Sequence, residues 1–144
     1  MIRAVVDTNV WVSAFLNPYG FPSQILDALK SDQFEPVTSE ILLEELLDVL
    51  SRPRLVKKYE LEPEDIAEFH FLLEQKSIKV YPKGEVYHCR DPRDDVLLET
   101  AILSHSKYIV SRDDDVKRDL KLIHMMQELG VTILSVSRFL KILE

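Results

Sequence analysis

IRAVVD, residues 2–7, decides the fold class, because a short β-branched strand ends directly in an aspartate. The arrangement returns in YIVSRDDD, residues 108–115, where the apolar run 108–110 leads into three consecutive aspartates. Short apolar, β-branched runs of this kind are typical of buried strands. Three adjacent like charges repel one another, and they could form a solvated loop tip, a helix cap or part of a cation site.

Segments with helical periodicity alternate with these strands along the chain. Further strands are predicted over 34–37, 78–81 and 131–134, the first of them weakly, because Pro36 favours an edge or irregular position. Helices are predicted over 10–16, 22–30, 39–52, 63–76, 94–106, 115–129 and 136–143, with Gly130 as a C-cap. The alternation predicts an α/β fold, a three-layer α/β/α sandwich with a mainly parallel central sheet.

Length and composition favour an ordinary globular chain with one domain over residues 1–144. The net charge of −7 argues mildly against a nucleic-acid binder, although carboxylates neutralised by metal would not count toward it. Cys89 is the single cysteine, so no intramolecular disulfide is expected. MIRAVVD reaches an aspartate too early for a signal-peptide core, and no apolar stretch has the length of a membrane span. We therefore expect a cytoplasmic protein that does not act at a membrane.

Acidic residues gather where strands end and helices begin. Asp7 follows the strand 2–6 directly, and Asp113 lies two residues beyond Ser111. Asp95 opens a predicted helix, where a carboxylate also suits the positive end of the helix dipole. Capping or turn formation would explain each residue alone. Because ligand sites of parallel sheets lie outside the carboxyl ends of the strands, their shared position favours a common site.

The helix SEILLEELLDVL, residues 39–50, supplies a fourth acidic candidate. At about 100° per residue, Glu40, Glu44 and Asp48 share one polar stripe and are expected to be solvated. Glu45 lies instead at the margin of the apolar face. An inward carboxylate needs compensation for its lost hydration. That compensation is a divalent cation or, as the alternative, a buried arginine.

Four carboxylates, on Asp7, Glu45, Asp95 and Asp113, suit a hard cation such as Mg²⁺ or Mn²⁺, which prefers oxygen ligands. The four histidines show no ligand-like spacing with Cys89, so zinc is not expected. P-loop, GxGxxG, GxSxG and HExxH motifs are all absent from the sequence. An acidic metal site without a nucleotide loop most naturally serves phosphodiester hydrolysis, because the metal activates water and polarises the phosphoryl oxygen.

Basic residues lie close to these acidic positions and could follow a nucleic-acid backbone. Some adjoin the acidic candidates, and others cluster in SRPRLVKKY, residues 51–59. The alternative for the second group is a solvated helix–loop junction. The candidate substrate-binding residues are Arg52, Arg54, Lys57, Lys58, Arg93 and Arg112, with Arg90 beside them.

Four ordered motifs resemble those of the PIN-domain ribonucleases. VVDTNVWVSA, residues 5–14, is similar to the family's opening strand followed by Asp-Thr-Asn, and ILLEELLDVLSRPRL, residues 41–55, resembles its second motif. DPRDDVLLETAILSHSKYIVSRDDDV, residues 91–116, resembles the third and fourth motifs, and GVTILSVSRFLKIL, residues 130–143, the last strand and helix. The resemblance covers nearly the whole chain and is nearest to the VapC-type toxin components of toxin–antitoxin systems.

This resemblance implies Mg²⁺- or Mn²⁺-dependent cleavage of RNA, with the family's acidic residues falling on the four carboxylates named above. It also implies a homodimer and a small antitoxin protein as inhibitor. Two assignments stay open, because Asp94 could replace Asp95 and Asp115 could assist Asp113. Candidate donors that orient the carboxylates are Thr8, Asn9 and Ser111, whose alternative roles are turn and cap formation.

Other functions are compatible with an aspartate after the first strand. A haloacid-dehalogenase-like phosphatase needs a second aspartate two residues later, where this chain has Asn9. A phosphoacceptor receiver domain needs an acidic pair after the first strand, where Asp7 stands alone. A catalytically weak or inactive RNA- or protein-binding module of the same fold is disfavoured by the filled acidic positions.

Overall fold

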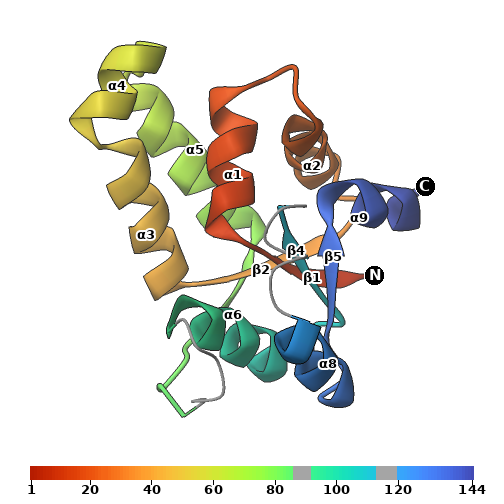
Figure 1. Ribbon diagram of the computed structural model, residues 1–144. Helices are drawn as coiled ribbons and strands as arrows, with labels where there is room; N and C mark the ends of the chain where they lie inside the picture. Colours follow the sequence, from red (N-terminus) through yellow and green to blue (C-terminus); the bar gives the residue numbers. More distant parts are fainter. Residues whose placement is uncertain (86–91, 113–119) are drawn as a thin grey trace.

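The computed structural model describes residues 1–85, 92–112 and 120–144. Strands and helices alternate through most of this part of the chain (Figure 1). The strands are β1 (Arg3–Val6), β2 (Glu35–Ser39), β3 (Ile78–Val80), β4 (Tyr108–Ser111) and β5 (Thr132–Ser135). The helices are α1 (Thr8–Leu16), α2 (Phe21–Lys30), α3 (Glu40–Leu50), α4 (Pro53–Tyr59), α5 (Pro63–Lys76), α6 (Pro92–Leu103), α8 (Leu120–Glu128) and α9 (Val136–Leu143).

The described strands form one parallel sheet in the order β3-β2-β1-β4-β5. All strands therefore end at the same edge of the sheet. The chain runs outward from β1 to β3 on one side and then returns to place β4 on the other side of β1. The strand order thus reverses between β1 and β4, and ligands of open α/β sheets bind at such a switch point, outside the carboxyl ends of the strands.

Helices cover both faces of the sheet (Figure 1). α6 and α8 lie on one face, and α1, α2, α5 and α9 lie on the other, with α3 and α4 beside them. The residues of β1 alternate between the two sides: Ala4 and Val6 pack in the same core cluster as Trp11 of α1, whereas Val5 packs with Leu98 of α6. The predicted three-layer α/β/α sandwich with a parallel sheet is confirmed.

The position of β2 differs from the prediction. Pro36 favoured an edge strand, yet β2 lies between β1 and β3. The backbone N–H of Glu35 donates to the carbonyl of Ile2 at 2.8 Å, so the nitrogen of Pro36 faces the opposite side, toward β3. Pairing with β3 begins only at Val37, opposite Ile78. The N–H that proline lacks would have met no ladder partner, so Pro36 is tolerated inside the sheet.

The segment after α3 also differs from the prediction. The helix predicted over 39–52 ends at Leu50, and a separate short helix, α4, begins at Pro53. Proline suits the first helical position, because its φ is already helical and its missing N–H would be unbonded there anyway. SRPRLVKKY is therefore mostly helix, although most of its side chains are solvated.

The helix ends beside the sheet follow ordinary capping chemistry. Ser39 is the N-cap of α3, where its hydroxyl accepts the backbone N–H of Leu42 at 3.4 Å. Gly130 has a φ of +82° after α8, and the N–H of Val131 donates to the carbonyl of Met126 at 2.8 Å. This geometry confirms Gly130 in the left-handed C-cap role. In the described part of the chain, every helix is too short or too polar to cross a bilayer.

Candidate metal centre at the carboxyl edge of the sheet

Asp7 lies at the switch point between β1 and β4. Its backbone N–H donates to the carbonyl of Val110 at 2.9 Å, which ties it to β4. One carboxylate oxygen accepts the backbone N–H of Asn9 at 3.3 Å, as the N-cap of α1, and the other accepts the hydroxyl of Ser111 at 3.4 Å. The partly buried carboxylate is therefore held in one orientation by two donors. A carboxylate fixed in this way presents only oxygen atoms, the ligand type that hard cations prefer.

The other two donor candidates, Thr8 and Asn9, lie in the first turn of α1. Thr8 follows Asp7 and is buried, with 2% of its surface exposed. Asn9 is partly buried and contacts Asp7 through its backbone N–H. Ser111 is buried at the end of β4, and its contact with Asp7 goes through the side chain. Of these three residues, Ser111 has the side-chain geometry of a group that orients a carboxylate.

Glu45 lies partly buried on α3, as its place beside the apolar face predicted. Its carboxylate Oε1 is 3.7 Å from Nη1 of Arg93, at the start of α6. The side chain of Glu45 is 26% exposed and that of Arg93 65% exposed. The alternative partner considered for Glu45, an arginine, is therefore present, but this arginine is solvated rather than buried. Glu40, Glu44 and Asp48 are exposed, as predicted from the helical stripe.

The first turn of α6 brings three candidate residues together. Arg93, Asp94 and Asp95 follow Pro92, where the helix begins two residues earlier than predicted. Arg93 is exposed, and both aspartates are partly buried. The aspartates lie at the positive end of the helix dipole, which stabilises negative charge there. The choice between Asp94 and Asp95 as a ligand stays open.

Glu99 is an acidic residue that the sequence analysis did not single out. It lies one turn after Asp95 on α6 and is 5% exposed. Its carboxylate accepts three backbone N–H groups from the segment after β3: that of Lys83 at 2.5 Å and those of Gly84 and Glu85 at 3.1 Å each. Glu99 is thus fully engaged as an anchor for this segment. The sequence pattern gave little indication of this role for Glu99, because no polar stripe runs through residues 97–101. In the structure these residues are all buried.

The donor chemistry of this edge suits a hard cation. Asp7, Glu45 and Asp95 offer only carboxylate oxygens, the ligands that Mg²⁺ and Mn²⁺ prefer. Asp113, predicted to complete the set, and Asp115, which could assist it, lie outside the described residues. Within residues 1–85, 92–112 and 120–144, no three His, Cys, Asp or Glu side chains form a group that could hold a metal. Mg²⁺ commonly takes one or two protein carboxylates and keeps several waters, so the described donors fit it.

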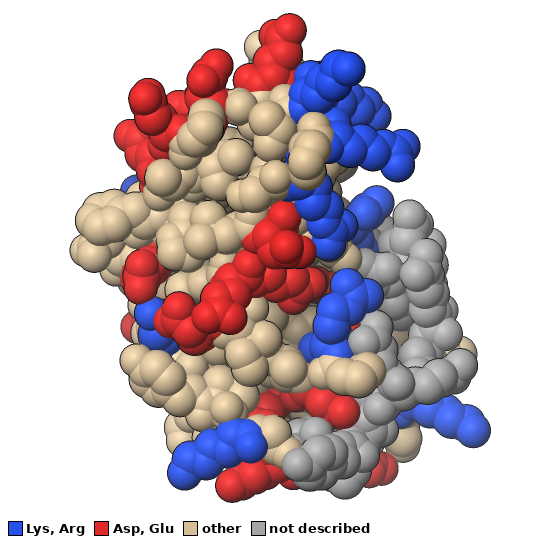
Figure 2. Space-filling view, turned by 90° about the vertical axis from the view of Figure 1, so that its left-hand side faces the viewer, with Lys and Arg blue, Asp and Glu red and all other residues tan. Residues whose placement is uncertain are grey.

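The candidate substrate-binding cations that the structure describes are exposed, and Arg90 lies outside the described residues. Arg54, Lys57 and Lys58 lie on α4, and Arg52 is its N-cap. Arg52 pairs with Asp48 of α3 at 3.3 Å, and Nζ of Lys58 lies 5.3 Å from the ring centre of Tyr59. Arg112 directly follows β4. Figure 2 shows the side of the molecule that lies at the left in Figure 1. On it, Lys and Arg side chains gather at the upper right and continue down the right-hand border, beside a group of Asp and Glu side chains. Positive charge is therefore concentrated locally although the chain as a whole is acidic.

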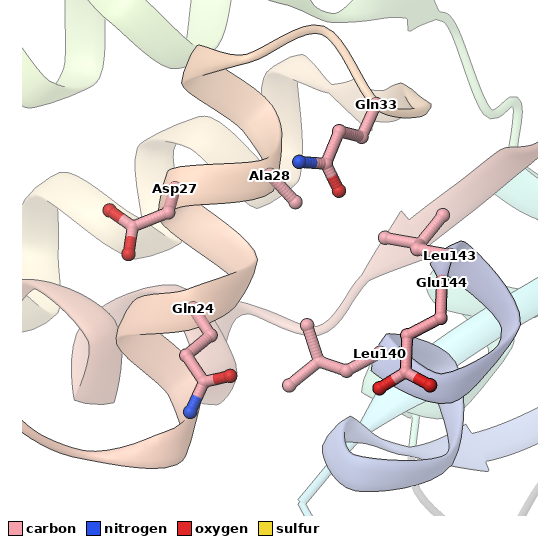
Figure 3. A pocket seen from close by; sticks show the side chains of 7 residues that line it. All are labelled: Gln24, Asp27, Ala28, Gln33, Leu140, Leu143 and Glu144. Carbon is pink, nitrogen blue, oxygen red and sulfur yellow. The ribbon is translucent and has the colours of Figure 1, made fainter.

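A cavity of about 270 Å³ lies away from these residues, between α2 and α9 (Figure 3). Its lining residues are Gln24, Asp27, Ala28, Gln33, Leu140, Leu143 and Glu144. None of them is a candidate site residue. Carboxylates, amides and leucines are mixed in this lining and do not converge on one ligand chemistry, so the carboxyl edge remains the candidate site.

Comparisons with known proteins agree with this architecture. An uncharacterized protein of Methanocaldococcus jannaschii, MJ1680, is 29% identical over 131 residues, which span 86% of this chain and 84% of that protein. The solved structure of VapBC2 from Rickettsia felis, bound to a DNA fragment from its promoter, matches with a TM-score of 0.59 and 15% identity, over 93% of this chain and 98% of that chain. A PilT N-terminus domain protein from Sulfolobus solfataricus, SSO1118, matches with a TM-score of 0.53 and 12% identity, over 99% of this chain and 93% of that chain. At these identities, the two solved structures share the fold.

The decisive match is to a family model. The model described as PIN domain matches residues 3–115, which include β1 to β4 and every acidic candidate named above. The prediction of one domain over residues 1–144 stays a prediction. The resemblance drawn from the four sequence motifs is confirmed, and the chain belongs to the PIN domain family.

Proposed function

We propose that the protein is a metal-dependent endoribonuclease that hydrolyses RNA phosphodiester bonds. The observation that carries this proposal is Asp7, a carboxylate held by two donors at the switch point of a PIN-domain sheet. Carboxylates at this edge, without any nucleotide-binding loop, suit a cation that acts on phosphodiesters. Membership of the PIN domain family supports the same reaction class.

Each acidic residue of the candidate site has a role in the proposed reaction. Asp7 and Asp95 would hold Mg²⁺ or Mn²⁺ together with Asp113, and Glu45 would ligate the same cation or orient the attacking water. When bound, the cation supplies activation of water and stabilisation of the charge that develops on the phosphate. Ser111 keeps the carboxylate of Asp7 in place by its hydrogen bond.

The exposed cations would position the RNA. Arg93 and Arg112 lie beside the acidic residues and would contact the phosphates nearest the reaction. Arg52, Arg54, Lys57 and Lys58 would follow the strand across α4. Backbone contacts of this kind supply affinity without base specificity, so they leave the RNA target undefined.

A role as the toxin of a toxin–antitoxin system is part of this proposal. The four sequence motifs resemble VapC-type toxins, and the VapBC2 structure shares the fold. A small antitoxin partner and a homodimer follow from the same resemblance and stay predictions, as does the cytoplasmic location expected from the sequence. An inactive binding module is the second candidate. Nothing in the site favours a dehalogenase-like phosphatase, because Asn9 stands at the position of its acid/base aspartate.

Cleavage of mixed RNA tests the proposal directly. Wild-type protein is incubated with Mg²⁺, Mn²⁺ or EDTA beside Asp7→Asn, and Asp27→Asn serves as a control on α2, where the side chain is exposed. Asparagine also caps helices well, so Asp7→Asn should keep the start of α1. We expect EDTA to abolish cleavage and Asp7→Asn to lower the cleavage rate by more than about 100-fold. Even outer-shell partners of a metal contribute about 10–100-fold to metal affinity or activity, and Asp7 is proposed as a direct ligand.

Two results would overturn the proposed function. Cleavage that persists in EDTA would exclude the metal, and cleavage that survives Asp7→Asn would exclude this site. RNA binding without cleavage by the wild type in either metal would favour the inactive module instead.

A further inference from the structure

Arg93 and Glu45 form an ion pair across two elements of the candidate site. Arg93 lies in the first turn of α6, and Glu45 lies on the inner side of α3, with 3.7 Å between Nη1 and Oε1. Glu45 is a predicted cation ligand or water-orienting group, so the guanidinium contacts an oxygen that the proposed reaction would need. The ion pair therefore involves a carboxylate to which the proposed reaction assigns a role.

The two partners differ in how far their side chains are exposed to solvent. Glu45 is partly buried, with 26% of its side chain exposed, whereas the side chain of Arg93 is 65% exposed. A partly buried carboxylate needs a positive partner more than a solvated guanidinium needs a negative one. The side chain of Arg93 is long and mostly exposed, so it is accessible to a phosphate, whereas Glu45 is the more enclosed partner.

We propose that Arg93 is an internal counter-ion that occupies Glu45 until a divalent cation replaces it. The inference rests on the proposed function, whose metal site it regulates. In the metal-free protein, the guanidinium offsets the charge of Glu45 and ties α3 to α6. Once a divalent cation neutralises the acidic residues, Arg93 is released and contacts a phosphate of the substrate, for which its planar guanidinium is suited.

A competing counter-ion has a signature that a purely structural contact lacks. Removing the guanidinium should let the divalent cation bind more tightly, because the positive charge that opposes it is gone. The same change should weaken the RNA complex, because a phosphate contact is lost. A contact that only braces α3 against α6 would instead weaken both steps or neither.

Two measurements on intact protein separate these outcomes. The Kd of Mn²⁺ is measured by calorimetry without RNA, and the KM for RNA cleavage is measured at saturating Mn²⁺. Arg93→Ala is compared with Arg93→Lys, which keeps the charge, and with Arg138→Ala, which removes one exposed positive charge from α9.

For Arg93→Ala we expect the Kd of Mn²⁺ to fall about two- to fivefold, the range set by an exposed ion pair, and KM to rise by a similar factor. Arg93→Lys should keep the Kd near that of the wild type, and Arg138→Ala should change neither value. Unchanged or weaker Mn²⁺ binding by Arg93→Ala, beside a wild type that binds Mn²⁺, overturns the inference alone. A wild type that binds no Mn²⁺ overturns the proposed function and the inference with it.

Discussion

Replacing Glu99 by glutamine should destabilise the fold through one identifiable contact. The carboxylate of Glu99 is buried in α6 and accepts three backbone N–H groups from residues 83–85. Gly84 has a φ of +76°, which turns these successive N–H groups toward one acceptor. The contact fastens the segment after β3 to the helix that carries Asp95.

The expected size of the effect follows from the atoms involved. The N–H groups of Gly84 and Glu85 share Oε1, which glutamine retains as its carbonyl oxygen. The N–H of Lys83 donates to Oε2, which becomes an NH₂ group, so two donors would face each other. An unsatisfied buried donor costs about 1–3 kcal/mol, and the two remaining bonds lose their charge assistance. We expect a total loss of about 2–4 kcal/mol in the free energy of unfolding.

Urea denaturation and thermal melting of Glu99→Gln would measure this loss. In a chain of 144 residues, about 3 °C of melting temperature corresponds to 1 kcal/mol, so the expected decrease is about 6–12 °C. Glu85→Gln is the matched control, since it changes an exposed carboxylate in the same segment and keeps its own backbone N–H. Amide hydrogen exchange should speed up at residues 83–85 of the Glu99 variant alone.

A Glu99→Gln protein within about 0.5 kcal/mol of the wild type, the range of ordinary surface substitutions, would refute this reasoning. Equal losses in the Glu85→Gln control would also refute it, because they would assign the effect to net charge rather than to the three hydrogen bonds.

Three further predictions concern a helix end, a surface network and the metal. Gly130→Ala should lower the free energy of unfolding, measured by urea denaturation, by about 1 kcal/mol, because a residue with a Cβ disfavours the φ of +82°. No atom lies within 4 Å of the added Cβ, so the loss would come from the backbone conformation alone. An unchanged urea midpoint would contradict this. The hydrogen bond from Lys79 lowers the pKa of the Glu74 carboxyl, so this pair stabilises the fold above the ordinary Glu pKa of 4.5 and loses its effect as the pH falls through the lowered value. NMR titration of Lys79→Met should show the pKa of Glu74 rising, and an unmoved pKa would contradict the assignment. Raising the Mg²⁺ concentration to ten times its Kd should add about 1.4 kcal/mol to the free energy of unfolding and raise the melting temperature by about 4 °C. A melting temperature that stays constant over a millimolar Mg²⁺ series would count against a preformed site.

The layer architecture could be predicted because local chemistry and tertiary structure agree along most of the chain. The runs 2–6 and 108–110 are rich in apolar, β-branched residues, and they fall on the paired strands β1 and β4, most of whose residues are buried. Glu45 could be placed because the helical period alone separates the exposed stripe of α3 from its inner margin. Asp7 could be placed because the carboxyl ends of parallel strands meet at one edge.

Features that depend on contacts between distant segments could not be predicted in this way. Pro36 suggested an edge strand, since nothing in the sequence shows that β3 begins pairing only at Val37. Glu99 was missed because its three donors come from a segment 14–16 residues away, folded back against α6. The pairing of Arg93 with Glu45 joins residues far apart in the chain, and only the approach of α6 to α3 reveals it.

Mn²⁺ binding by the wild type and Asp7→Asn tests the central claim most directly, because it isolates the metal site from RNA recognition. Calorimetry on the two proteins at equal concentration, with Asp27→Asn as control, gives the Kd of each. We expect the wild type and Asp27→Asn to bind Mn²⁺ alike and Asp7→Asn to bind it at least about tenfold more weakly, since even outer-shell partners of a metal contribute about 10–100-fold to its affinity. Equal Mn²⁺ affinity of Asp7→Asn and the wild type would contradict a metal centre at the switch point of the sheet.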